Sequence, residues 1–335
     1  MANINLKSYL DAQVAENGLS LELAALLCGL GETGKKISHE VSRGALAGVL
    51  GLAGTENVQG EDQKKLDVIS NEIMVEGCFA TGAVTAVASE EMDHCLPAAA
   101  GAKTGPLLVC FDPLDGSSNV DIDATIGTIF SVLPAPAGKT SAQIVDEDFL
   151  QPGTNQLAAG YILYGPQTLM AFTVGRGTVM FTLDRDSNDF YLTVPTAVIP
   201  EATQEFAINC SNMRHWEAPV KDYMSELFAG KTGVRGKDFN MRWVACMATE
   251  VHRLLCRGGI FMYPKDNRNP DRPGKLRLMY EANPMSWLIE QAGGHATNGY
   301  ARILEIRPEK LHQRVAVFLG AAEEVDRVTS YHQKR

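Results

Sequence analysis

The sequence has few basic residues for its size and no long apolar run. It holds 30 lysine and arginine residues against 40 aspartate and glutamate residues, which gives a formal net charge of −10. This balance disfavours a nucleic-acid binder, because such proteins normally carry a basic patch. No stretch of about 18 apolar residues occurs, so we expect no transmembrane helix and no membrane partner. The charge balance still allows cation binding, and binding of small anions by a few placed basic side chains.

Paired cysteines are missing as well. The seven cysteines are odd in number, none forms a Cys-x-x-Cys pair, and several lie in apolar runs. Cysteine in such runs behaves as a small buried hydrophobe, and scattered thiols are typical of a reducing compartment. The first ten residues, MANINLKSYL, lack the apolar core of a signal peptide. We therefore expect a cytoplasmic protein.

Helix-like and strand-like patterns alternate along the 335 residues, which are enough to bury a large core. The patterns predict a mixed α/β (α+β) fold, rich in antiparallel strands, with two domains at residues 1–197 and 198–335. Strand-like runs are expected at 82–88, 107–111, 126–133 and 157–193, and near 258–264. Helical patterns are expected at 21–50 in two pieces, from 66 onward, and near 216–228, 243–256 and 282–292.

One glycine-rich stretch is similar to a phosphate-binding loop. Residues 29–36 read GLGETGKK, which matches GxGxxG and nearly matches GxxxxGK[ST]. Both fingerprints need a preceding strand, but the preceding LELAALL is helix-like. Lys36 also stands where the second pattern needs a hydroxyl. We therefore favour a glycine-broken connection between helices, and a nucleotide-binding regulatory module stays as an alternative.

The strongest chemical signal is VCFDPLDGSSNVD at residues 109–121. The apolar run predicts a strand, and Pro113 predicts a turn directly after it, since proline fixes φ and removes a donor. Asp112 and Asp115 can then converge, with the Leu114 carbonyl as a third oxygen. Such a set suits Mg²⁺, with Mn²⁺ as a plausible substitute.

The residues that follow these acids suit an anion. Gly116, Ser117 and Ser118 offer backbone N–H groups and two hydroxyls, which can hold a phosphate beside the metals. The simpler alternative is an Asx-type turn with surface serines.

Four further acids are candidates for the same site. Glu90 and Glu91 follow a strand-like run, Asp67 lies in a helical pattern, and Glu281 precedes an apolar helix. Taken alone, each would be a surface or structural carboxylate. If they meet, the site has only oxygen ligands and suits two or three Mg²⁺ or Mn²⁺ ions that activate water and polarise a phosphoryl group.

With these motifs the chain resembles class I fructose-1,6-bisphosphatase of the bacterial type, within the lithium-sensitive sugar and inositol phosphatase superfamily. The DPLDGSS run alone marks only the superfamily, whereas the later blocks are specific to the bisphosphatase. The likeness runs nearly end to end and includes NVQGEDQKKLDV (57–68), ASEE (88–91), RWVACMATEVHR (242–253) and GKLRLMYEANPM (274–285).

The resemblance implies a fold of alternating helix and mixed-sheet layers, with effector-type helices at the N-terminus. It implies a homotetramer that removes the 1-phosphate of fructose 1,6-bisphosphate with Mg²⁺, a reaction of gluconeogenesis. The same chemistry on sedoheptulose 1,7-bisphosphate, alone or as a second activity, is the alternative. A catalytically dead scaffold is disfavoured because every expected metal ligand is present.

Roles for individual residues also come from the resemblance. The implied metal ligands are Glu90, Asp112, the Leu114 carbonyl, Asp115 and Glu281. The acids implied in a further metal site and in activating water are Asp67 and Glu91. The implied contacts of the cleaved phosphate and its sugar are Asp115, Gly116, Ser117 and Ser118. The implied distal phosphate and sugar contacts are Asn209, Tyr263, Lys275 and Arg242, the last reaching into the neighbouring subunit's site.

The chain departs from relatives that are regulated. Pro106 and Leu107 replace a Lys-Tyr pair of the AMP site, and Leu133 and Pro134 stand where an arginine completes it. No cysteine lies between Phe111 and Asn209, where chloroplast members carry a cysteine-bearing insertion. We therefore expect neither AMP control of the usual kind nor thioredoxin switching.

Overall fold

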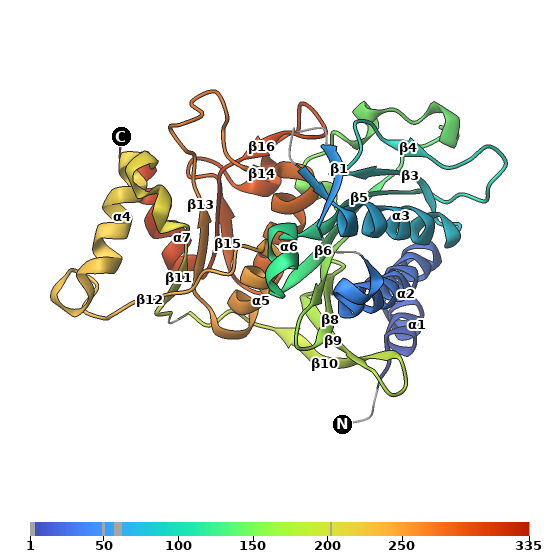
Figure 1. Ribbon diagram of the computed structural model, residues 1–335, viewed down its shortest axis with the longest axis horizontal. Coiled ribbons are helices and arrows are strands. Elements are labelled where there is room, and N and C mark those ends of the chain that lie inside the picture. The colour runs from blue at the N-terminus through green and yellow to red at the C-terminus, as the bar shows by residue number, and fades with distance from the viewer. Residues whose placement is uncertain (1–3, 49–50, 57–61, 202, 335) are drawn as a thin grey trace.

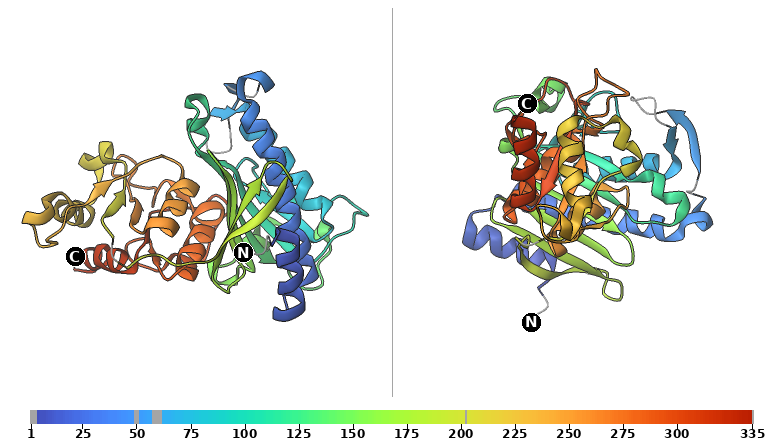
Figure 2. Two further views of the ribbon diagram at one scale, coloured as in Figure 1. Left: turned by 90° about the horizontal axis from the view of Figure 1, so that it is seen from below. Right: turned by 90° about the vertical axis from the view of Figure 1, so that its left-hand side faces the viewer.

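Helices and sheets alternate in layers along the long axis of the molecule (Figures 1 and 2). The computed structural model describes residues 4–48, 51–56, 62–201 and 203–334. Two sheets are separated by a helical layer, and each sheet carries further helices on its outer face. This arrangement confirms the predicted mixed α/β fold and its alternating layers.

The larger sheet has eight strands in the order β10-β9-β8-β7-β6-β5-β3-β4. Neighbouring strands are antiparallel except β3 and β5, which are parallel. Its inner strands are buried on both faces, which explains why runs such as VTAVAS and AAGYILY do not alternate in polarity. The strands are β3 (Val84–Ser89), β4 (Leu96–Pro97), β5 (Leu107–Asp115), β6 (Ile126–Pro134), β7 (Ala158–Tyr164), β8 (Thr168–Thr173), β9 (Thr178–Asp184) and β10 (Asp189–Ala197).

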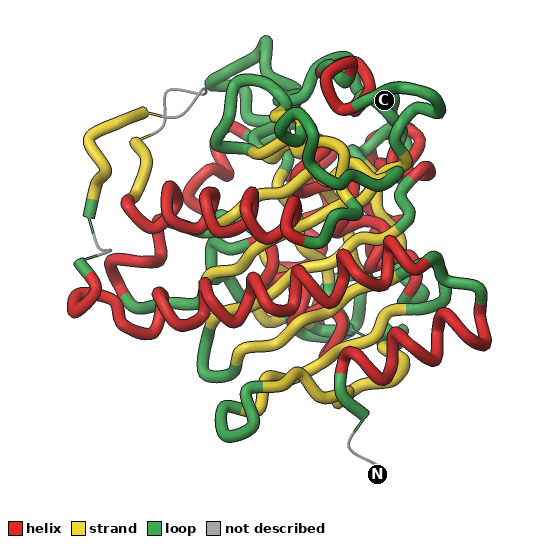
Figure 3. The backbone as a smooth tube through the Cα atoms, turned by 90° about the vertical axis from the view of Figure 1, so that its right-hand side faces the viewer, coloured by secondary structure: helices red, strands yellow, loops and turns green. Residues whose placement is uncertain are grey.

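Three helices cover one face of this sheet (Figure 3). They are α1 (Leu6–Asn17), α2 (Leu21–Arg43) and α3 (Lys65–Ala80). Ser20 begins α2 as its N-cap, because its hydroxyl accepts the N–H of Leu23 at 3.1 Å. The apolar sides of all three helices form one core with the sheet.

The expected break in the N-terminal helical region is wrong, because α2 runs unbroken through its glycines. A Cβ on Gly34 would lie 2.5 Å from Cδ1 of Ile162 in β7, and one on Gly29 would collide with Thr81 at the end of α3. These glycines allow close packing inside the protein, and their N–H groups lie within a helix. The motif therefore forms no phosphate-binding loop, and the nucleotide-binding alternative loses its basis.

The smaller sheet has five strands in the order β12-β11-β13-β17-β15. These are β11 (Glu205–Ala207), β12 (Asn240–Met241), β13 (Ile260–Tyr263), β15 (His295–Thr297) and β17 (Val317–Gly320). The helices α5 (Met247–Arg257) and α6 (Asn283–Gln291) contact both sheets, whereas α4 (Ala218–Ala229) and α7 (Ala322–Gln333) cover the outer face. Two short pairs complete the fold: β1 (Leu52–Glu56) with β2 (Asp62–Lys64), and β14 (Leu276–Arg277) with β16 (Arg314–Val315).

The chain passes from the larger to the smaller sheet after residue 197. Strand β10 ends at Ala197 and β11 begins at Glu205. We propose that the domain division at 197/198 falls in this connection.

One apolar core joins the two halves, since side chains of β6 and β7 pack with those of α5 and α6. The polar sequence at 55–63 predicts a loop, but residues 55–56 and 62–63 belong to β1 and β2, and residues 57–61 lie outside the described residues. No helix in the described ranges is long and apolar enough to cross a membrane.

Gly160 in β7 provides a test of the packing between the inner strands. A Cβ at this position would lie 2.5 Å from the carbonyl oxygen of Ala171 and would collide with the ring of Phe130. Since backbone cannot rotate away, we expect Gly160→Ala to lower the free energy of unfolding by about 1–3 kcal/mol, measured by denaturant titration. Gly165→Ala is the control, because its Cβ meets only the side chain of Thr125, at 3.1 Å. Equal unfolding midpoints for the two variants would contradict this packing.

Candidate active site

Two parallel strands deliver the first acids to one edge of the larger sheet. Ser89 at the end of β3 pairs with Phe111 in β5, so Glu90 and Asp112 lie side by side. Glu281 comes from a π-helical turn, Leu278–Ala282, which packs against β5. Ligand oxygens of Glu90, Asp112 and Glu281 all lie within 4.8 Å of one another, and all three residues are buried.

Strand β5 does not end where the sequence predicted. It continues through Pro113 to Asp115, and its pairing with β6 shifts by one residue between Asp112 and Asp115. The expected turn directly after Phe111 is therefore wrong, because the irregular pairing accommodates the proline within the strand. The Leu114 N–H also donates to Asp112 Oδ1 at 2.9 Å, so an Asx-type bond forms within the same motif. Both aspartates face one cavity as a result.

Asp115 joins the two halves of the chain. Its Oδ2 accepts the N–H of Ala248, in the first turn of α5, at 2.6 Å and lies 3.2 Å from Sγ of Cys246. Negative charge at a helix N-terminus is favourable. Gly116 follows with φ of +79°, and a Cβ there would lie 2.7 Å from the Cβ of Cys246. The turn that carries the two serines is therefore pressed against the C-terminal half, and only glycine fits at its start.

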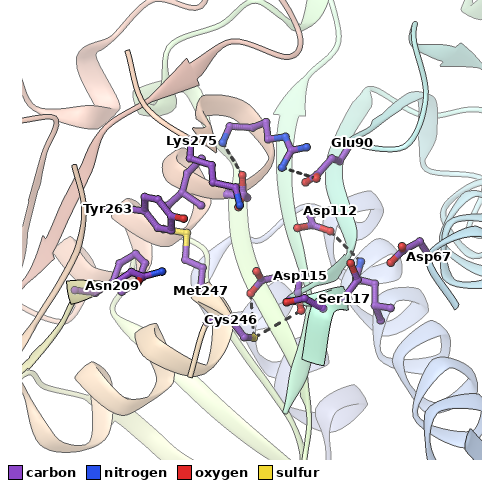
Figure 4. A pocket seen from close by; sticks show the side chains of 18 of the residues that line it. Asp67, Glu90, Asp112, Asp115, Ser117, Asn209, Cys246, Met247, Tyr263 and Lys275 are labelled. Carbon is purple, nitrogen blue, oxygen red and sulfur yellow. Dashed lines mark hydrogen bonds and ion pairs between the residues drawn. The ribbon is translucent and has the colours of Figure 1, made fainter. Parts of the chain in front are cut away.

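Asp67 approaches the same cavity from the first turn of α3. Its Oδ2 accepts the N–H of Lys64 at 2.7 Å. Glu91 lines the cavity beside it. The structure thus brings together in one cavity all six acids that the sequence singled out, although they come from α3, β5, the residues after β3 and the turn before α6. Four of them, Asp67, Glu90, Asp112 and Asp115, are labelled in Figure 4.

The packing of like charges away from water disfavours their ionised forms. Burial, together with the neighbouring Glu91, raises the pKa of Asp67 to about 7. Burial, with Glu281 and Glu91 nearby, likewise raises the pKa of Glu90 to about 8. Arg277 lowers the pKa of Glu90 from a distance of 2.7 Å between Nη1 and Oε1, but it offsets only part of the effect. The cluster therefore favours either protons or a bound cation.

The donor set fits a hard divalent metal ion. Every acid in the cluster offers oxygen, the atom that Mg²⁺ and Mn²⁺ prefer. Among the described residues, Glu90 Oε2 is buried and has no hydrogen-bond partner. A buried carboxylate oxygen without a donor is costly unless a cation fills that role.

The cavity has a volume of about 450 Å³ and two chemically different ends. The acids and the Gly116–Ser118 turn form one end, and Asn209, Tyr263 and Lys275 lie across from them (Figure 4). Arg242 does not line the cavity of its own chain. Its side chain is half exposed, with Nε 3.5 Å from Glu205 Oε1. The structure therefore brings together every predicted site residue except Arg242.

Sequence reasoning missed Arg277 and Cys246. Arg277 is buried against Glu90, and a buried arginine is rare unless it is paired, so its place in the apolar run LRLMYE was an available signal. The thiol of Cys246 contacts Asp115 across 131 residues of sequence. No local pattern indicates that contact.

The positions that departed from the AMP site lie together elsewhere. Three of them, Pro106, Leu107 and Pro134, line a separate cavity of about 410 Å³ between the start of α2 and the larger sheet. The loss of AMP control stays a prediction.

An oxygen-only acid cluster, a glycine-serine turn beside it and a lysine at the far end define a site for metal-assisted reaction of a phosphorylated small molecule. The family model described as fructose-1-6-bisphosphatase, N-terminal domain, matches residues 6–195, and the model of the C-terminal domain matches residues 199–333. The holo structure of Leishmania major fructose-1,6-bisphosphatase is 34% identical, with a TM-score of 0.91 and 100% of both chains covered. The apo structure of that protein is 33% identical, with a TM-score of 0.86 and the same coverage.

The chain belongs to the fructose-1,6-bisphosphatase family. It is therefore a phosphatase, and membership implies dependence on a divalent metal ion, for which the buried acids provide a site.

The raised pKa values predict how the metal-free protein responds to pH. The folded chain holds protons on Asp67 and Glu90 up to about 7 and about 8, whereas their ordinary values are 3.8 and 4.5. Between these limits the folded state binds more protons than the unfolded state, so the free energy of unfolding falls as pH rises. Thermal unfolding in EDTA between about pH 5 and about pH 8 measures this fall.

Added Mg²⁺ should raise the unfolding temperature more at the upper end of this range, because fewer protons then compete for the carboxylates. Asp67→Asn is the control and should make the fall with pH shallower, since it removes one of the titrating acids. A pH-independent unfolding temperature in EDTA, with the same Mg²⁺ effect at every pH, would contradict this account.

Proposed function

We propose that the protein hydrolyses the 1-phosphate of fructose 1,6-bisphosphate and releases fructose 6-phosphate and inorganic phosphate. The observation that carries the proposal is the single cavity in which the acid triad Glu90, Asp112 and Glu281 faces Asn209, Tyr263 and Lys275. A bisphosphate carries an anion at each end. The cavity offers acids suited to metal ions at one end and the ammonium group of Lys275 at the other. Family membership over almost the whole chain supports this substrate.

The residues at the acid end have distinct tasks in this proposal. Glu90, Asp112, the Leu114 carbonyl, Asp115 and Glu281 would hold two or three Mg²⁺ ions, with Mn²⁺ as a substitute. Bound there, the ions supply charge neutralisation of the phosphate and of the oxygen atoms that attack and leave. The Gly116 N–H and the hydroxyls of Ser117 and Ser118 orient the phosphate.

Asp67 and Glu91 are the proton acceptors in this proposal. They take it from the attacking water, whose oxygen bonds to phosphorus as the bond from phosphorus to the sugar O1 breaks. The released O1 ends protonated as the sugar hydroxyl. The raised pKa of Asp67 suits a group that accepts a proton near neutral pH.

The end of the cavity opposite the acids binds and orients the substrate. Lys275 provides a positive charge for the 6-phosphate, and Asn209 and Tyr263 provide amide and hydroxyl donors. The described residues of the cavity hold no feature that favours sedoheptulose 1,7-bisphosphate.

Arg242 supports a shared site between subunits. Its guanidinium is half exposed and lies outside the cavity of its own chain, so it is available to the site of a second copy. We propose the homotetramer on this basis. The cytoplasmic location expected from the sequence stays a prediction.

Glu91→Gln tests the mechanism. Loss of the proton acceptor should lower kcat for fructose 1,6-bisphosphate by about 10²–10⁴-fold with little change in KM, measured as phosphate release with Mg²⁺. EDTA should abolish turnover by the wild type. Glu217→Gln is the matched control, since Glu217 is also partly buried but does not line the cavity. A folded wild type without turnover on this substrate, or a fully active Glu91→Gln variant, would overturn the proposal.

A further inference from the structure

Cys246 contacts Asp115 from the opposite half of the chain. Its Sγ lies 3.2 Å from Asp115 Oδ2 and 3.7 Å from the Asp115 carbonyl oxygen (Figure 4). The residue is 2% exposed and borders the active-site cavity. An ionised carboxylate offers only acceptors, so a thiol at this distance interacts with it favourably as the S–H donor. The thiol therefore donates to a carboxylate that the proposed function assigns to the metal site.

The hydroxyl of Thr249 directs this bond. Thr249 lies in the first turn of α5, and its Oγ1 donates to Sγ of Cys246 at 3.1 Å. A thiol is both a weak donor and a weak acceptor. Since its acceptor side faces the Thr249 hydroxyl, its proton is directed toward Asp115. The three side chains thus form one chain of hydrogen bonds that ends on the carboxylate.

The carboxylate of Asp115 receives a second donor at the same oxygen. The N–H of Ala248 donates to Oδ2 at 2.6 Å. One donor would leave the carboxylate free to turn about its last bond, whereas two donors that meet on one oxygen from different atoms restrict that rotation. A ligand oriented in advance loses less conformational freedom when it binds a cation, and the binding is tighter for that reason.

The backbone that carries Cys246 is held by contacts within the protein. The N–H of Val244 donates to Glu250 Oε1 at 2.8 Å, and the carbonyl of Val244 accepts Asn119 Nδ2 at 2.9 Å. On its other side the sulfur is closely packed, because a Cβ on Gly116 would lie 3.3 Å from Sγ. The thiol therefore has little room to turn away from the carboxylate.

We propose that Cys246 is a positioning residue that orients the Asp115 carboxylate for the divalent metal ion. The inference rests on the proposed function, which makes Asp115 a metal ligand. Cys246 is not itself a ligand in this proposal, since Mg²⁺ prefers oxygen to sulfur and the S–H proton is directed to Asp115. Its effect is on the affinity for metal and not on the chemical step.

Cys246→Ala tests the proposal by removing the donor. Mg²⁺ alone is titrated into metal-free protein at constant pH, and the rise in unfolding temperature gives an apparent dissociation constant. This constant should rise by about threefold to tenfold, the effect of one hydrogen bond. At saturating Mg²⁺, kcat and KM for fructose 1,6-bisphosphate should stay within about twofold of the wild-type values, because the groups that contact the substrate are retained.

Cys246→Ser should rescue the affinity. Its hydroxyl also donates, so the Mg²⁺ dissociation constant should return to within about twofold of the wild-type value. Serine is smaller than cysteine and does not restore the lost packing, so a rescue identifies the hydrogen bond as the cause. Thr249→Val, which removes the group that directs the thiol, should raise the constant by a smaller factor. It provides a second reading if Cys246→Ala does not fold.

Cys78→Ala is the matched control. Cys78 is 0% exposed, against 2% for Cys246, but it lies in α3 and does not line the active-site cavity. Its variant should lose stability because a buried sulfur is removed. It should keep the wild-type Mg²⁺ dissociation constant.

The inference fails on any of three outcomes. They are an unchanged Mg²⁺ dissociation constant in both Cys246→Ala and Thr249→Val, an equal rise in Cys78→Ala, or no rescue by Cys246→Ser. These titrations contain no substrate, so they are read separately from turnover. Absence of bisphosphate turnover by the wild type, with the Mg²⁺ series as expected, would contradict the proposed function alone.

Discussion

The structure depends on the convergence of carboxylates at one buried edge of the larger sheet. Isolated carboxylates at such positions would take up protons or distort the fold, since burial penalises their charge. Arg277 and the N-terminus of α5 offset part of this penalty at Glu90 and Asp115. Divalent cations can offset the rest of this penalty. The packing of buried carboxylates that destabilises the empty cluster therefore also gives the cluster its affinity for metal.

The fold holds this cluster by making it the junction of the two halves. Asp115 accepts the Ala248 N–H, and Asn119 donates to the carbonyl of Val244 at 2.9 Å. Glu250 in turn accepts the Val244 N–H at 2.8 Å. Between these anchors Ala245 adopts φ of +60°, a left-handed conformation that costs an alanine on the order of 1 kcal/mol. The strain is local to the cavity wall, and the surrounding hydrogen bonds maintain it.

Much of this arrangement could be predicted from the sequence. Apolar runs that end in acids identify strand ends, and the DPLDGSS motif places two acids and an anion-binding turn within seven residues. The residues that sequence reasoning handled poorly are those whose roles depend on tertiary contact. Gly29 and Gly34 matched a loop motif, but close packing against Thr81 and Ile162 is their actual function. Pro113 signalled a turn, but a shifted strand pairing absorbs it. The contact of Cys246 with Asp115 has no local signature at all.

The separation of charge along the cavity explains why one chain needs both halves. The N-terminal half supplies most of the acids, from α3, β5 and the residues directly after β3, whereas Asn209, Tyr263 and Lys275 at the opposite end come from the C-terminal half. Facing each other across a cavity of about 450 Å³, the two sets suit a ligand that carries an anion at each end, one beside metal ions and one beside the ammonium group of Lys275. A monophosphate can satisfy only one end and leaves the other set of charges without a partner. The way in which the two halves meet therefore supports the proposed bisphosphate substrate.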